Sequence, residues 1–82
     1  MRTEFSKNSL GDWVKVFRDN ETRPVLCGKV VEFDGWPTWQ IWRDIDEPAE
    51  YPIFLNANAT EQEISAAIEK EIAARPEYAQ LF

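Results

Sequence analysis

Residues 25–44 read VLCGKVVEFDGWPTWQIWRD, and this stretch decides the fold. Two runs rich in β-branched and aromatic residues flank the dipeptide Asp34-Gly35. Asp and Gly both tolerate the positive φ angles that a type I′ turn requires, and this pattern is the strongest short-range signal for a β-hairpin. We therefore expect two antiparallel strands that are joined by a two-residue turn.

The two-residue turn also fixes the register of the hairpin, because side chains alternate between the two faces of a sheet. Counting outward from the turn places Phe33 opposite Trp36 and Gly28 opposite Ile41. Gly28 either admits the bulky Ile41 side chain or marks a bulge. The other predicted pairs are Val31 with Thr38, Lys29 with Gln40, Cys27 with Trp42, Val30 with Trp39 and Leu26 with Arg43.

Two further strands are predicted outside the hairpin. Residues 12–18 alternate between Val and larger or charged side chains, and residues 51–55 form a short run whose Pro52 is typical of an edge strand. Residues 1–11 are polar apart from two large apolar side chains, so we expect them to form a loop or a docked arm.

One helix is predicted over residues 60–75. It begins at a capping box in which the Thr60 hydroxyl accepts from the Glu63 N–H and the Glu63 side chain reaches back. Pro76 ends it, and residues 76–82 are expected to form a C-terminal turn. The fold prediction is a single α+β domain over residues 1–82. It consists of an antiparallel β-meander of three to four strands over residues 12–55, with one C-terminal amphipathic helix packed on one face.

The charge of the chain narrows the class of partner. The net charge is −6, from 15 acidic and 9 basic residues, and there is no histidine. A negative surface repels phosphate backbones and anionic membranes, so we expect neither direct nucleic-acid binding nor membrane binding, whereas a basic partner is favoured. Cys27 is the only cysteine and no apolar leader is visible, so we expect a cytoplasmic protein without a disulfide.

The sequence offers little for catalysis. Without histidine the usual general base near neutral pH is missing, and no phosphate-binding or nucleophile motif is present. We therefore expect a protein that is not an enzyme and that holds no cofactor or metal. One cluster of acidic residues has three possible interpretations. It is a solvated loop, an electrostatic contact for a basic partner, or the divalent-metal site of a carboxylate enzyme. Its residues are Asp44, Asp46, Glu47 and Glu50.

One face of the predicted sheet is unusually apolar. An antiparallel sheet with one wet face normally alternates between apolar and polar residues, yet here both faces carry large apolar side chains. Three interpretations remain open: residues 1–10 or 76–82 cover the second face, two copies associate through it, or it docks another protein. This second aromatic face comprises Trp13, Phe17, Val25, Cys27, Val31, Phe33, Trp36 and Trp42.

The favoured function is a small acidic protein-binding domain that masks a basic surface of its partner, as inhibitors, immunity-type proteins and accessory factors of phages or mobile elements do. Candidate contact residues are Trp36 and Trp42 as anchors, Phe33 and Trp13 beside them, and the four acidic loop residues. The alternative is a homodimeric structural domain, or one that binds a small ligand between sheet and helix.

Overall fold

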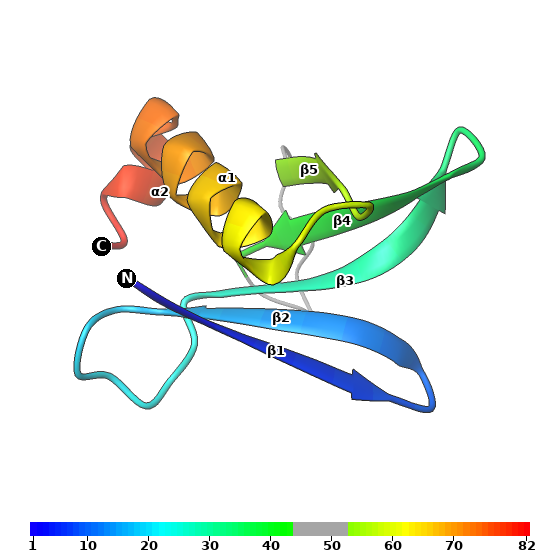
Figure 1. The fold of residues 1–82 in the computed structure, drawn as a ribbon. Coiled ribbons are helices and arrows are strands. Elements are labelled where there is room, and N and C mark those ends of the chain that lie inside the picture. Colours follow the sequence, from blue (N-terminus) through cyan, green and yellow to red (C-terminus); the bar gives the residue numbers. More distant parts are fainter. Residues whose placement is uncertain (44–52) are drawn as a thin grey trace.

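The computed structural model describes residues 1–43 and 53–82 of the chain. Its five strands form one antiparallel sheet in the order β1-β2-β3-β4-β5, and a helix follows the last strand, so the α+β prediction is confirmed (Figure 1). The prediction of three to four strands is wrong, because the sheet has five. The elements are β1 (Arg2–Asn8), β2 (Gly11–Phe17), β3 (Leu26–Phe33), β4 (Trp36–Trp42), β5 (Ile53–Asn56), α1 (Glu61–Ala74) and α2 (Pro76–Ala79).

The additional strand is β1, where a loop or arm was predicted. It pairs with the whole length of β2, from Arg2 opposite Phe17 to Asn8 opposite Gly11. Its alternation of buried and exposed side chains is weak. Only Thr3 and Phe5 are partly buried, and the other residues of the strand are polar and exposed. This segment extends the sheet beside the second aromatic face, and Arg2 Cζ lies 4.5 Å from the centroid of the Phe17 ring on that face.

The central hairpin has the predicted register. Phe33 lies opposite Trp36, Gly28 opposite Ile41 and Cys27 opposite Trp42. Asp34 and Gly35 have φ angles of 51° and 81°, both positive, as a type I′ turn requires.

Gly28 admits the Ile41 side chain, and the pairing on both sides of it continues without a bulge. A Cβ atom at position 28 would lie 2.6 Å from Ile41 Cγ1 and 2.9 Å from the Gln40 carbonyl oxygen. Only glycine fits this close approach between β3 and β4.

The core lies between one face of the sheet and α1. Val14, Val16, Leu26, Trp39 and Ile41 from the strands form one buried cluster with Ile53 of β5. The helix contributes residues at a spacing of four to the same cluster, namely Ile64, Ile68 and Ile72. The predicted capping box is present: Glu63 N–H donates to Thr60 Oγ1 at 3.2 Å, and Thr60 N–H donates to Glu63 Oε1 at 3.4 Å.

Both ends of the chain lie at one end of the domain, and the two hairpin turns lie at the other (Figure 1). At the first end the Met1 ammonium bonds to Asp19 Oδ1 at 2.8 Å, and Arg18 Nε donates to the Leu81 carbonyl oxygen. Tyr78 of α2 is buried in the core cluster, and this burial raises the pKa of its phenol. We call this the closed end, and the end with the hairpin turns the open end.

Candidate functional site

An exposed group of aromatic side chains lies toward the open end of the sheet. Trp36 is 66% exposed, Phe33 is 52% exposed and Phe54 is 43% exposed. They come from β4, β3 and β5, and we call them the aromatic patch. By alternation, all three side chains belong to the face of the sheet opposite the core residues.

The turn and the strand register hold the patch together. Asp34-Gly35 places Phe33 directly across from Trp36. The ring of Phe33 also lies against that of Phe54, with centroids 5.1 Å apart and planes tilted by 31°. Thr38 is nearly buried on the same face, and its hydroxyl donates to the Trp36 carbonyl oxygen at 3.0 Å. The patch is therefore built on paired strands, which position its side chains more firmly than a loop would.

The charges next to the patch are acidic. Glu32 and Asp34 flank Phe33 in the hairpin, and both are exposed. Basic side chains on this face lie farther along the strands, among them Lys29, which is partly buried, Lys15 and Arg2. A partner that approaches the patch at the hairpin tip therefore meets exposed rings beside the Asp34 carboxylate, whereas Glu32 alternates onto the opposite face.

The other predicted aromatic contacts have different surroundings. Trp42 is only 5% exposed, so its ring is not part of the exposed aromatic patch, and its role as an anchor stays a prediction. Its indole N–H has no hydrogen-bond partner within the described residues. Trp13 is partly buried, its Nε1 donates to Asn8 Oδ1 at 3.1 Å, and Lys29 Nζ lies 5.9 Å from its ring centroid. Of the four predicted aromatic contacts, Trp36 and Phe33 are the most exposed.

The four acidic candidates, Asp44, Asp46, Glu47 and Glu50, lie outside the described residues. Phe54 was not predicted as a contact, although its segment was predicted as a strand. Its place in the patch depends on the register of β5 against β4, in which Phe54 lies opposite Gln40. Two strands separated by a long connection carry no turn signal that fixes this register.

A cavity of about 530 Å³ lies at the same end of the domain, on the opposite face of the sheet. Phe5, Val30 and Trp39 form its apolar floor, and Phe5 packs edge-to-face on Trp39 with ring centroids 5.8 Å apart. Its other walls come from the segment before α1 and from the first turns of that helix. Pockets of this size accommodate small ligands or side chains of a partner.

Two further observations concern metal binding and membrane spanning. Within residues 1–43 and 53–82, no group of three or more Asp, Glu or Cys side chains is placed to hold a metal ion. In the same residues, no helix is long and apolar enough to cross a membrane. The features that remain are a patch of exposed rings, a cavity and an acidic charge.

Comparison of this chain with protein-family models, with curated proteins and with solved structures found no match.

Proposed function

We propose that this protein is a small, acidic, non-enzymatic binding domain that masks a basic surface of a partner protein through its aromatic patch. Inhibitors, immunity-type proteins and accessory factors of phages or mobile elements act in this way. The observation that carries the proposal is the exposure of Phe33, Trp36 and Phe54 next to one another. Contiguous exposed apolar surface on a small domain marks an interaction site more often than chance.

The aromatic rings and the charges contribute to different properties of the proposed complex. Tryptophan and other aromatic residues supply most of the binding energy at interfaces, because they bury a large area in few rotamers. The net charge of −6, with Asp34 beside the patch, speeds encounter with a basic surface and fixes its orientation. The same charge disfavours direct contact with nucleic acid.

Self-association through the patch is the second candidate function. Two copies that pack through Trp36 and Phe33 would bury the same exposed rings, and a two-fold axis brings identical patches together. The like charges at the hairpin tips oppose this arrangement, because Asp34 of each copy would approach the other. Light scattering after size exclusion, over a tenfold range of concentration, separates a stable dimer from a monomer.

The test of the proposal begins with affinity capture from an extract of the native cell, followed by purification of the captured protein. Calorimetric titration then compares the unchanged chain with the double variant Trp36→Ala/Phe54→Ala. Because the loss of even one hot-spot residue costs about 2 kcal/mol, we expect the double variant to bind at least about thirtyfold more weakly. Added salt is expected to slow association.

Leu10→Ala is the matched control, because Leu10 is an exposed apolar residue of the other hairpin turn, outside the patch. It should bind like the unchanged chain. Equal affinity of the double variant and the unchanged chain would show that the patch is not the interface. A stable dimer that the double variant dissociates would favour the second candidate function.

A further inference from the structure

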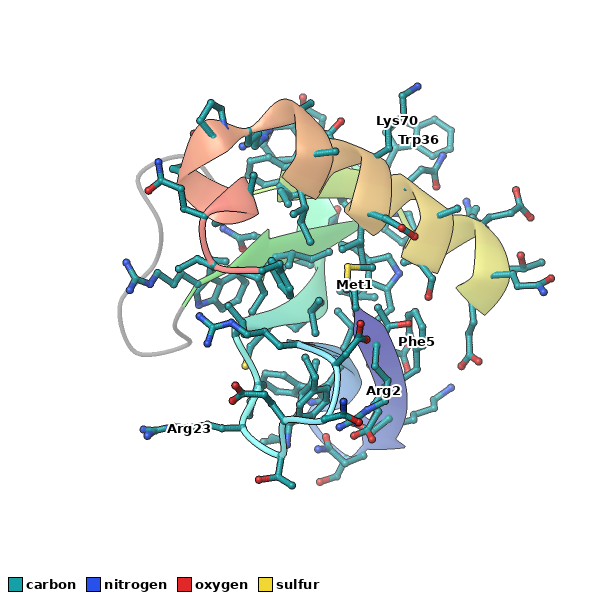
Figure 2. All side chains as sticks on the ribbon, turned by 90° about the vertical axis from the view of Figure 1, so that its left-hand side faces the viewer. Met1, Arg2, Phe5, Arg23, Trp36 and Lys70 are labelled. Carbon is teal, nitrogen blue, oxygen red and sulfur yellow. The ribbon has the colours of Figure 1, made fainter. Side chains whose placement is uncertain are left out.

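The cavity lies next to an open edge of the sheet. Phe5, Ser6 and Lys7 of β1 form part of its wall, and within the described residues β1 pairs with β2 alone. The opposite wall includes Glu61 and Ile64 of α1. In Figure 2, Phe5 lies on the side of β1 that faces the first turns of the helix. A groove is therefore bounded by an unpaired strand edge on one side and a helix on the other.

The edge of β1 offers backbone groups for pairing. In an antiparallel ladder, pairs that exchange hydrogen bonds alternate with pairs that do not. The Asn8–Gly11 pair closes the two-residue turn, and counting back from a bonded closing pair leaves Thr3, Phe5 and Lys7 with N–H and C=O groups directed away from β2. An extended peptide that adds to a sheet edge gains its affinity from such groups.

The side chains around the cavity select the chemistry of what enters it. The floor is apolar, from Phe5, Val30 and Trp39, and Ala57 leaves room above it. The charged residues are Lys7, Asp12 and Glu61, which sum to −1. Lys7 Nζ lies 4.0 Å from Asp12 Oδ1, whereas Glu61 makes no side-chain ion pair within the described residues. An apolar floor below the Glu61 carboxylate suits a side chain with an aliphatic stem and a cationic head.

We propose that an extended peptide segment of a partner pairs with the open edge of β1 and places a lysine or arginine side chain in this cavity. A residue directly opposite Phe5 would share its face, so its side chain would point toward the helix and over the cavity. The stem would pack on Phe5 and Trp39, and the cationic head would meet Glu61 and Asp12. This site is separate from the aromatic patch, and the inference does not depend on the patch being an interface.

The probe is the peptide acetyl-Val-Thr-Lys-Thr-Val-amide, titrated into the ¹⁵N-labelled protein and followed by NMR. We expect shifts in the amides of Thr3, Phe5 and Lys7 and in the indole N–H of Trp39, with fast exchange. Two control peptides carry glutamate in place of the lysine, or an N-methylated lysine that cannot donate to β1. Both should bind at least about fivefold more weakly, because one loses the charge match and the other loses a backbone bond.

Variants of the protein separate the cavity from the edge. Ala57→Leu fills the cavity and should weaken peptide binding about tenfold, whereas Ala73→Leu, at an exposed position of α1, should leave it unchanged. Glu61→Gln should weaken binding about twofold to fivefold, in contrast to Glu69→Gln on the exposed side of the helix. The NMR spectrum of each variant shows whether its fold is intact.

Several outcomes would overturn this inference. If the glutamate peptide binds as tightly as the lysine peptide, the charge of the side chain does not determine binding. If Ala57→Leu leaves the affinity unchanged, the peptide side chain does not enter the cavity. No shift in β1 at millimolar peptide, or a dimer whose interface is the β1 edge, would also contradict it. The Trp36→Ala/Phe54→Ala variant should bind the peptide normally, so failure of the patch and failure of this site are distinguishable.

Discussion

Aromatic side chains of the second aromatic face are buried at the closed end of the domain and exposed toward the open end. At the closed end, Trp42 and Phe17 are 5% and 4% exposed, although both lie on the second aromatic face. Toward the open end of that same face, Trp36 and Phe33 are mostly exposed. The ion pair of Met1 with Asp19, the bond from Arg18 to Leu81 and the burial of Tyr78 all belong to the closed end.

This difference shows that one sheet face can serve two purposes. Buried aromatic residues stabilise a small domain because each removes a large area from water. Exposed aromatic residues give up that stabilisation in the isolated protein and recover it only when a partner covers them. We therefore expect stability to depend on the closed end, and binding to depend on the open end, where the patch and the cavity both lie.

The largest expected effect separates two tryptophans of β4. Trp42→Ala removes a buried indole and should lower the free energy of unfolding by about 3–5 kcal/mol. Trp36→Ala should change it by no more than about 0.5 kcal/mol, because that side chain is exposed. Urea unfolding followed by far-ultraviolet circular dichroism measures both. Similar losses for the two variants would mean that the two ends do not differ in stability.

The turn at the open end gives the next largest effect. Gly35 has a φ of 81° and no atom near the position of an added Cβ, so Gly35→Ala tests backbone strain alone. We expect a loss of about 1 kcal/mol, with faster amide exchange around the hairpin tip than at the closed end. Gly35→Asn is the control and should lose less, because Asn enters the left-handed region more readily. Equal losses for Ala and Asn would contradict the turn assignment.

A smaller effect tests whether the patch is one unit. Phe33 and Phe54 are in ring contact, so a double-mutant cycle of Phe33→Ala and Phe54→Ala should give a coupling energy of about 0.5 kcal/mol. Chemical unfolding of the four proteins measures this coupling. The pair Leu10→Ala and Phe54→Ala is the control, and its effects should simply add. A coupling of zero between Phe33 and Phe54 would divide the patch into independent residues.

The smallest effect concerns the ion pair at the closed end. Hydrogen bonding to the Met1 ammonium, followed by its charge, lowers the pKa of the Asp19 carboxyl below its usual value of 3.8. A lowered folded-state pKa contributes stability that is present above the unfolded pKa and is lost as the pH falls through the folded pKa.

Asp19→Asn should therefore be slightly less stable than the unchanged chain at about pH 6, with the difference gone at about pH 2. Asp34→Asn, in the exposed turn of the open end, is the control. Thermal unfolding of all three proteins at both pH values measures the difference. A deficit of Asp19→Asn that persists in acid would assign the effect to something other than the charge of Asp19.

Much of the fold follows from local signals in the sequence. Asp34-Gly35 predicts both the hairpin and its register, and Thr60 with Glu63 predicts where the helix begins, because turns and caps depend on a few adjacent residues. Strand β1 could not be predicted in this way. Its polar, exposed residues resemble a loop, and its pairing with β2 supplies the order that its own sequence lacks.

The candidate site was predictable only in part. Alternation assigns Trp36 and Trp42 to the same face, but it does not say which end of that face stays open. Trp42 is 5% exposed, and alternation alone does not predict that burial. Phe54 joins the patch through the pairing of β5, and the cavity depends on small side chains such as Ala57 before the helix. Such tertiary features have no local signature.

The contacts of Arg18 and Asp19 have a practical consequence for engineering. These two adjacent residues hold the last and the first parts of the chain, through Leu81 and Met1 respectively. A short flexible linker should therefore be able to join the two ends, and circular permutation is best tolerated when the original ends are close together. New termini opened in the Asp34-Gly35 turn would then keep every strand while cutting the chain between Phe33 and Trp36.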